Sequence, residues 1–302
     1  MVNNVNFDLK AYLLEMRGQV DNALNEYFPD VDGLTADLIK AMRYSLFAGG
    51  KRLRPILCMA GAETVGGEKR RVQPVACALE LIHTYSLIHD DLPLMDDDDL
   101  RRGKPTNHKV FGDAIALLAG DGLLTEAFSL MTSSYATGQI APDLLLEAIR
   151  MISGAAGHDG MVGGQVVDMQ WEGKKAELET VKFLHTRKTG ALITASVTSG
   201  AILVGARESQ VRAVLSYGNK IGLAFQISDD ILDVEGDTET MGKMAGADEE
   251  KGKTTYPSVL GLDESKKIQS ALVQEAVRDL EEFGERAEPL RQIAYYIIER
   301  KK

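Results

Sequence analysis

The stretch VACALELIHTYSLIHDDLPLMDDDDLRRG, residues 75–103, decides the fold and points to the chemistry. Its first fifteen residues are apolar nearly all round, which is typical of a helix buried in a core. Residues 90–99 then hold six aspartates, and two arginines follow directly. Carboxylates about 4 Å apart repel each other by roughly 1–4 kcal/mol per pair. A solvated acidic loop is the plain alternative, but the position after a buried helix favours a cation-binding site at the rim of the core.

The pattern stays helical outward from this stretch. Apolar residues recur at helical spacing in four further segments, residues 38–49, 114–131, 143–157 and 211–234. Alternating stretches, hairpin turn pairs, repeats and low-complexity linkers are scarce. We therefore predict one all-α domain, residues 1–302, in which many helices surround a core. The uncharged run 189–206 reaches the lower length limit of a membrane span, but its threonines, serines and glycines favour a buried core helix.

Composition limits the partners and the compartment. The chain has 302 residues and a formal net charge of −11, which argues against nucleic acid or an anionic membrane as the main partner. Its two cysteines, Cys58 and Cys77, lie in apolar surroundings without a pairing pattern, which suits a reducing cytoplasm. The N-terminal residues lack the basic start and long apolar run of a signal peptide.

Two acidic clusters could share one site. Asp96 follows Asp90 by six residues and would lie about 240° away on an unbroken helix, but Pro93 between them interrupts helical hydrogen bonding. A break there would bring Asp96 back toward Asp90. In the second cluster, QISDDILD, Gln226, Asp229 and Asp233 lie on one helix face. Carboxylate clusters at core rims suit Mg²⁺, and no Cys/His spacing indicates zinc.

Basic residues gather in several short motifs. They are Lys51, Arg52 and Arg54 in GGKRLRP, Arg101 and Arg102, Arg187 and Lys188 in HTRKTG, and Lys243 and Lys253 in the segment 242–257. Each alone is most often a solvated charge, and GGKR lacks the spacing of a Walker phosphate loop. Together with the acidic clusters they indicate a diphosphate substrate, held by metal on one side and by cations on the other.

Taken together, the motifs of this chain resemble those of a known family. The motifs GGKRLRP, DDLPLMDDDDLRRGKPTNH, GGQVVD, KTGAL, FQISDDILD and GKTTYP stand in the order typical of the short-chain trans-prenyl diphosphate synthases (polyprenyl synthetases), in particular the bacterial farnesyl diphosphate synthases. The resemblance implies an all-helical isoprenoid synthase type I fold around a deep central cavity, and a cytoplasmic homodimer. It also implies three Mg²⁺ ions, for which Mn²⁺ can substitute.

The resemblance assigns roles to individual residues. The metal ligands are Asp90, Asp96 and Asp229, supported by Asp91, Asp230 and Asp233. The residues at the allylic diphosphate and the reacting carbons are Arg101, Lys188, Thr189, Gln226, Lys243 and Lys253. The residues that bind isopentenyl diphosphate are Lys51, Arg54, His83 and Arg102.

The implied reaction joins isopentenyl diphosphate head-to-tail to dimethylallyl and geranyl diphosphates, giving (E,E)-farnesyl diphosphate. Tyr85 lies five residues before Asp90, about 7.5 Å back along the helix. From the sequence alone it is an ordinary core aromatic. In the resembling enzymes an aromatic residue there, with the two-residue insertion in the first motif, accompanies a C15 product. A C20 geranylgeranyl diphosphate synthase, a non-catalytic synthase subunit and a terpene cyclase remain alternatives.

Three further features of the sequence each have two interpretations. His89-Asp90 also spells the motif of metal-dependent phosphohydrolases, which would need additional histidine ligands. Gln165 and Asp168 could line the cavity or make buried hydrogen bonds. The basic end, residues 299–302, is typical of a solvated tail, although in the resembling family the C-terminus can close over the site.

Overall fold

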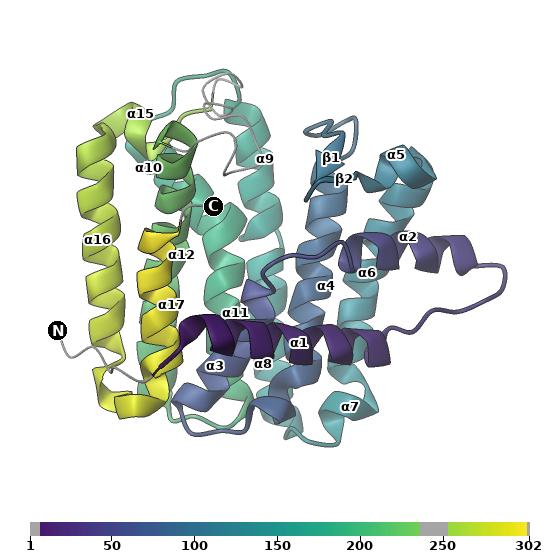
Figure 1. Cartoon of the computed structure of the whole chain (residues 1–302), viewed down its shortest axis with the longest axis horizontal. Helices are drawn as coiled ribbons and strands as arrows, with labels where there is room; N and C mark the ends of the chain where they lie inside the picture. The colour runs from purple at the N-terminus through teal and green to yellow at the C-terminus, as the bar shows by residue number, and fades with distance from the viewer. Residues whose placement is uncertain (1–6, 236–252, 301–302) are drawn as a thin grey trace.

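The chain folds almost entirely into helices, which confirms the all-α prediction (Figure 1). The computed structural model describes residues 7–235 and 253–300. The first half contains α1 (Leu9–Tyr27), α2 (Ala36–Leu46), α3 (Leu53–Thr64), η1 (Lys69–Val72), α4 (Gln73–Asp90), β1 (Leu100–Arg101), β2 (Lys104–Pro105), α5 (Asn107–Phe111), α6 (Asp113–Thr132), α7 (Ser134–Thr137) and α8 (Pro142–Ala156). The second half contains α9 (Met161–Trp171), α10 (Leu178–Leu184), η2 (His185–Gly190), α11 (Ala191–Leu203), α12 (Glu208–Glu235), α15 (Tyr256–Leu260), α16 (Leu262–Asp279), η3 (Glu281–Ala287) and α17 (Glu288–Glu299).

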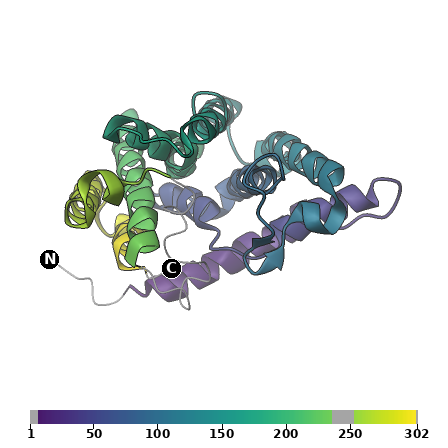
Figure 2. The ribbon, with the colours of Figure 1, turned by 90° about the horizontal axis from the view of Figure 1, so that it is seen from above.

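The long helices stand side by side, and α1 and α2 lie across one face of them (Figures 1 and 2). Helix α4 packs on α6, α3 on α11, and α11 on α12, so α4 lies inside the bundle. One cluster of buried hydrophobic residues runs through helices from α1 to α17. That residues 1–302 form a single domain stays a prediction.

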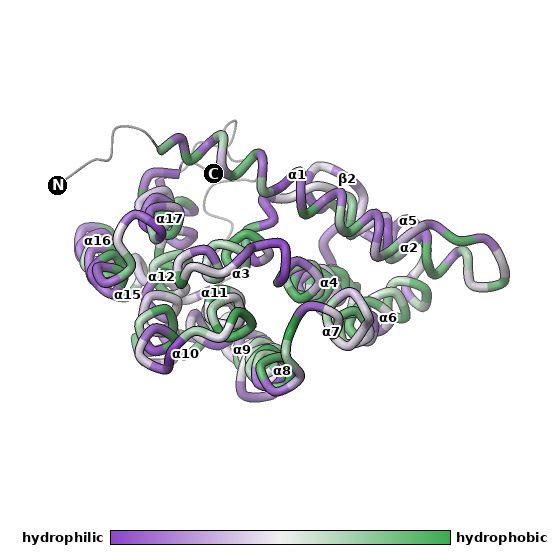
Figure 3. Tube along the Cα trace, turned by 90° about the horizontal axis from the view of Figure 1, so that it is seen from below, coloured by the Kyte–Doolittle hydropathy of each residue, from purple (hydrophilic) through white to green (hydrophobic). Residues whose placement is uncertain are grey.

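Helix α11 is buried along almost its whole length, as the uncharged run 189–206 predicts. All of its residues after Ala191 are buried, and Figure 3 shows it almost without hydrophilic residues. Two glycines allow α3 and α11 to approach closely. A Cβ added at Gly200 would lie 1.8 Å from the carbonyl oxygen of Cys58, and one added at Gly61 would lie 2.1 Å from that of Val197. Glycine at these positions is therefore a packing requirement.

Among the described residues, one helical stretch is apolar and long enough to cross a membrane by composition alone, and it is Asp113–Thr137, not the run 189–206. Its mean hydropathy is 1.4, and 39% of its most apolar window is buried inside the chain. One side of this helix packs against α4, while the other carries exposed leucines. The helix therefore belongs to the bundle and presents an apolar outer face.

Candidate active site

The first aspartate cluster begins where α4 ends. The helix ends at Asp90, and a turn through Pro93 follows. The backbone N–H of Asp96 donates to the carbonyl oxygen of Asp90 over 2.9 Å, so the turn returns Asp96 to the end of the helix. The predicted break is therefore present. It places two aspartates that are six positions apart in sequence beside each other at the rim of the core.

Asp91 has a different role from its neighbours. It is 3% exposed, and Arg101 Nε donates to its Oδ1 over 2.6 Å, while Arg101 also pairs with Asp98 at 3.3 Å. Arg101 stands on a short antiparallel hairpin, β1–β2, whose two turn residues, Arg102 and Gly103, both have positive φ angles. Positive φ at both positions is what a tight two-residue hairpin requires. The hairpin thus fixes Arg101 against the first cluster.

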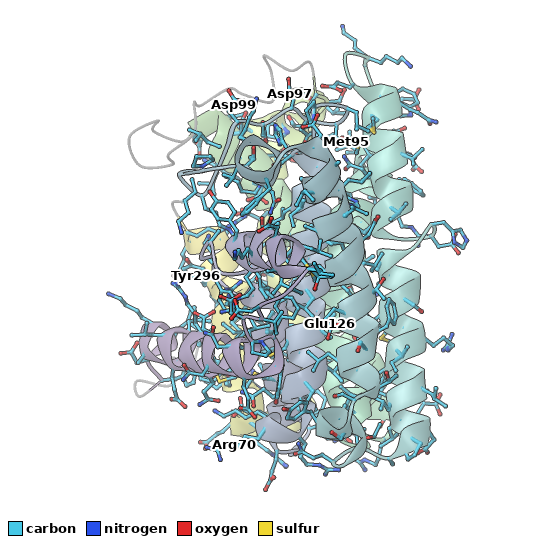
Figure 4. All side chains as sticks on the ribbon, turned by 90° about the vertical axis from the view of Figure 1, so that its right-hand side faces the viewer. Arg70, Met95, Asp97, Asp99, Glu126 and Tyr296 are labelled. Carbon is cyan, nitrogen blue, oxygen red and sulfur yellow. The ribbon has the colours of Figure 1, made fainter. Side chains whose placement is uncertain are left out.

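The carboxyl group of Asp90 lies in an electrostatic setting that favours a cation. Burial raises its pKa to about 6, the Lys188 ammonium opposes this rise, and the nearby Asp96 charge adds to it. A carboxylate that is costly to ionise becomes favourable to ionise when a metal ion binds it. Asp97 and Asp99 lie with Met95 at the same end of the molecule, far from Arg70 at the opposite end (Figure 4).

The second cluster lies on α12. Gln226 Nε2 donates to Asp229 Oδ2 over 3.0 Å, which confirms that these residues share a helix face. Asp229 Oδ1 also accepts a hydrogen bond of 2.6 Å from Arg300 Nη2. Burial raises the pKa of Asp229, and the guanidinium of Arg300 opposes that rise. Asp233 lies one turn further along the same helix.

Arg300 is a site residue that the sequence analysis did not find. Its side chain is 4% exposed, it donates to the carbonyl oxygen of Phe225, and its Cζ lies 4.0 Å from the centre of the Phe225 ring. The basic end is therefore not a solvated tail at this residue. A C-terminal arginine looks like surface charge in a sequence, and only its contact with Asp229, 71 positions away, reveals the role.

Lys188 and Thr189 lie on η2, a π-helical segment between α10 and α11. Such segments occur frequently at functional sites. Lys188 Nζ donates to Asp168 Oδ2 over 2.6 Å, so the aspartate of the GGQVVD motif orients this lysine. A pocket of about 160 Å³ joins the segment to the second cluster. Its lining includes Asp168, His185, Lys188, Gln226, Asp229, Asp230 and Lys253.

A second group of basic side chains forms the other part of the site: Arg54 and His83 are half-buried, and Arg102 is exposed. Burial lowers the pKa of Arg54 to about 10, and burial together with the charges of Arg54 and Arg102 lowers the pKa of His83 well below its usual value. Arg54 Nε is buried without a hydrogen-bond partner in the described part of the chain. Arg102 donates to the carbonyl oxygen of Gly49. Mutually repelling, incompletely satisfied cations of this kind suit a polyanionic ligand such as a diphosphate.

Arg52 holds the GGKRLRP segment in place. It is 3% exposed and adopts a left-handed backbone conformation with φ of 52°. Its guanidinium pairs with Asp21 and with Glu80, each at 2.8 Å, and donates to the carbonyl oxygen of Leu46. Of the basic residues in this motif, Arg52 is therefore structural. Lys51, its neighbour, lies near enough to the second cluster for its charge to oppose the rise in the pKa of Asp229.

Tyr85 lies on α4 beneath Asp90. Its ring is 6% exposed and meets the ring of His89 edge-on, with ring centres 5.7 Å apart. Burial raises the pKa of Tyr85 to about 12, and the charge of Asp90 adds to this effect. His89 Nε2 donates to the carbonyl oxygen of Leu117 on α6, over 3.0 Å. Tyr85 is therefore a neutral, bulky group on α4 that packs against His89, which is itself hydrogen-bonded to α6.

The remaining predicted residues have different surroundings. Lys253 lines the pocket beside Lys188, and Lys243 lies outside the described residues. Both polar atoms of the Gln165 amide are buried, and neither has a hydrogen-bond partner within residues 7–235 and 253–300. Asp230 is buried, and its carboxylate accepts hydrogen bonds from His185 and from the backbone N–H of Tyr256.

The histidines do not form a phosphohydrolase metal site. Across the described ranges, no three His, Cys, Asp or Glu side chains converge on one metal position. His89 is bound to Leu117, and His108 is hydrogen-bonded to Thr106. The donor set still fits Mg²⁺, which is usually bound through one or two carboxylates together with waters and substrate phosphates. Asp90 with Asp96, and Asp229 separately, supply such carboxylates.

Comparisons with known proteins identify the family of the chain. The family model described as polyprenyl synthetase matches residues 35–293. The farnesyl diphosphate synthase of Bacillus subtilis is 47% identical over 270 residues, covering 89% of this chain and 90% of the relative. The geranylgeranyl diphosphate synthase of Cyanophora paradoxa is also 47% identical, over 296 residues, covering 98% and 97%.

A solved structure shows the same architecture. The crystal structure of an FPP/GFPP synthase from Zymomonas mobilis superimposes with a TM-score of 0.86 at 38% identity, covering 96% of this chain and 98% of that one. The matched family and its relatives place this all-helical chain in the class of prenyltransferases. The chain belongs to the polyprenyl synthetase family.

Proposed function

We propose that this chain is a farnesyl diphosphate synthase, which condenses isopentenyl diphosphate with dimethylallyl and then geranyl diphosphate. The observation that carries the proposal is the pairing of two charge systems in one site. The aspartate clusters suit a metal-bound diphosphate, and the guanidinium groups of Arg54 and Arg102 beside the neutral imidazole of His83 suit a second diphosphate that needs no metal. A terpene cyclase, which takes one diphosphate substrate, has no use for the second group.

Mg²⁺ would be held by Asp90 and Asp96 on one side and by Asp229 on the other, with Asp91 and Asp233 supporting them. The metal supplies charge stabilisation for the diphosphate as it leaves. Lys188 and Arg101 lie against the same clusters, where they stabilise the growing negative charge on that leaving group. Lys253 lines the same pocket as Lys188, and we assign it the same role.

Cleavage of the allylic C–O bond leaves a delocalised carbocation. We assign to the side-chain oxygens of Thr189 and Gln226 the role of favouring this cation electrostatically. The double bond of isopentenyl diphosphate, held by Lys51, Arg54, His83 and Arg102, attacks the cation and forms the new C–C bond. The proton then lost passes to the departed diphosphate, so the proposal assigns no protein base.

Tyr85 supports a C15 product. A fixed, neutral ring beneath Asp90 would block a growing chain after three isoprene units. The second candidate is a C20 geranylgeranyl diphosphate synthase, which the equal identity to the Cyanophora relative favours as strongly as the Bacillus relative favours C15. The length of the product therefore depends on whether Tyr85 forms the floor of the chain cavity.

The test is a comparison of two substitutions at Tyr85. We expect Tyr85→Ala to extend the product from C15 to C20 or longer, because it removes the ring. Tyr85→Phe is the matched control, since it keeps the ring and loses only the hydroxyl, and it should still release C15. A folded, active Tyr85→Ala variant that stops at C15 would overturn the assignment of this residue.

We also infer a homodimer. Helices α6, α8 and α9 expose large apolar side chains on neighbouring surfaces, and α8 contacts both of the others. These residues are Leu117, Leu118, Leu146, Val162, Val166 and Met169, each at least 45% exposed. Contiguous exposed apolar residues of this kind mark protein interfaces, and a second copy of the same chain is the commonest partner.

We place the protein in the cytoplasm. Cys58 and Cys77 are both free and buried, and burial raises the pKa of Cys58 to about 12. Buried, neutral thiols of this kind behave as small core hydrophobes, as in proteins of a reducing compartment.

A further inference from the structure

Asp230 is the member of the second aspartate cluster whose carboxylate is bound by donors from two other segments of the protein. It is 5% exposed, and its Oδ2 accepts two hydrogen bonds of 2.8 Å each, one from His185 Nε2 and one from the backbone N–H of Tyr256. A carboxylate can only accept, so His185 must carry its proton on Nε2. One oxygen atom therefore joins three separate elements, η2, α12 and α15.

His185 is held in this contact from a second side. Its ring stacks on the ring of Tyr256, with ring centres 5.5 Å apart and an interplanar angle of 16°. The His185 side chain is 13% exposed, and Tyr256 is 3% exposed. The orientation of the imidazole is thus fixed by packing as well as by the hydrogen bond.

Residues assigned to the metal and to the allylic diphosphate lie on η2, on α12 and just before α15. Lys188 and Thr189 follow His185 on η2, Asp229 directly precedes Asp230 on α12, and Lys253 lies three residues before Tyr256. A displacement of η2 relative to α12 would move Lys188 relative to Asp229. Some residues do not touch the metal but hydrogen-bond to its ligands and orient them. Removal of such a residue typically lowers activity or metal affinity by about 10–100-fold.

We propose that His185 is a positioning residue, which acts through Asp230 to hold Lys188, Asp229 and Lys253 in register around the allylic diphosphate. This inference rests on the proposed function, because it takes the diphosphate site as given. It also separates the two aspartates of the pair: Asp229 is available to a metal, whereas Asp230 is the anchor between elements.

Two substitutions separate the hydrogen bond from the stacking. His185→Phe keeps a ring against Tyr256 and removes the donor, whereas His185→Gln places an amide N–H near the former Nε2 and removes the ring. We expect His185→Phe to lower kcat by about 10–100-fold and to raise the Mg²⁺ concentration for half-maximal activity. The KM for isopentenyl diphosphate should stay within about threefold, because its binding group lies on other elements. His185→Gln should recover most of the kcat.

A control variant and a binding measurement complete the test. Tyr217→Phe, on the same helix α12, loses a buried hydrogen bond of 2.7 Å to Leu290 away from the site, so it should lower stability without changing kcat or the Mg²⁺ requirement. Calorimetric binding of inorganic diphosphate with Mg²⁺ should weaken in His185→Phe and persist in His185→Gln and Tyr217→Phe. If His185→Phe does not fold, Asp230→Asn, which weakens the same contact, takes its place.

The inference is overturned if His185→Phe keeps its kcat and Mg²⁺ requirement within threefold of the wild type. It is also overturned if His185→Gln fails as severely as His185→Phe, because restoring a donor near the former Nε2 would then restore nothing. A wild-type chain without condensation activity would contradict the proposed function, while the calorimetric comparison would still decide the role of His185.

Discussion

Arg300 Nη2 donates to Asp229 Oδ1 over 2.6 Å, joining the end of the described chain to the second aspartate cluster. The arginine is almost fully buried, whereas the Asp229 side chain remains 45% exposed to the pocket. The buried guanidinium thus contacts a carboxylate that is also accessible from the pocket. Arg300 and a bound Mg²⁺ would compete for the same negative charge.

We therefore expect two effects from Arg300→Met, which keeps much of the apolar volume and removes the charge. The metal-free protein should lose about 1 kcal/mol of stability, a small value because Asp229 is partly solvated. The Mg²⁺ concentration for half-maximal activity should fall, because Asp229 loses a competing cation. Denaturant unfolding and a Mg²⁺ titration measure these effects, and an unchanged or higher Mg²⁺ requirement would contradict the competition.

Asp90 gives a pH prediction for the metal-free protein. Its pKa rises from an ordinary 3.8 to about 6, so the folded state binds this proton more tightly than the unfolded state. Stability should therefore fall as the pH rises from about 4 to about 6, by at most about 3 kcal/mol from this group. Asp90→Asn should remove this loss and be more stable than the wild type at pH 7 without Mg²⁺, while losing activity.

The measurement for Asp90 is denaturant unfolding of both proteins in EDTA at several pH values. Equal slopes of stability against pH for the wild type and Asp90→Asn would show that Asp90 is not the group responsible.

Gly120 on α6 is a second point of close contact. A Cβ there would lie 2.1 Å from His89 Nε2, the residue against which Tyr85 packs. Gly120→Ala should cost about 1–3 kcal/mol of stability, because His89 must move out of a packed position. Gly18→Ala is the matched control on α1, where no atom lies within 4 Å, and it should be neutral or stabilising. Thermal unfolding that finds the two variants alike would refute the contact.

The apolar outer face of α6 predicts the oligomeric state. Leu118→Asp should convert a dimer to a monomer, raising the dissociation constant roughly 100-fold or more, because burying an unpaired carboxylate costs several kcal/mol. Leu34→Asp, at an exposed leucine in the loop before α2, should leave the mass unchanged. Light scattering coupled to size exclusion gives the masses, and a monomeric wild type would exclude the proposed homodimer.

Local features of this site could be predicted from the sequence. Pro93 predicted the turn that returns Asp96 to Asp90, and the spacing of Gln226 and Asp229 predicted their shared face, because both depend on backbone geometry within one turn or helix. The absence of charged residues from 189–206 predicted the burial of α11, because burial of a helix depends on its own composition.

Contacts between distant segments could not be predicted in this way. His185 and Asp230 lie 45 positions apart, and Arg300 and Asp229 lie 71 apart. Each of these residues has an ordinary local setting, a polar position in a helix or a charged residue near the chain end. Only the packing of η2 against α12, and of the segment after α17 against α12, gives them their roles.

The most direct test of the account is the size of the product made by the wild-type chain. The purified protein is incubated with Mg²⁺, isopentenyl diphosphate and dimethylallyl, geranyl or farnesyl diphosphate, and the prenyl alcohols are sized after dephosphorylation. The account predicts a C15 product that disappears in EDTA, with farnesyl diphosphate a poor acceptor of further units. A folded protein that produces no condensation product would contradict the proposed reaction, and a C20 product would contradict Tyr85 as the floor of the cavity.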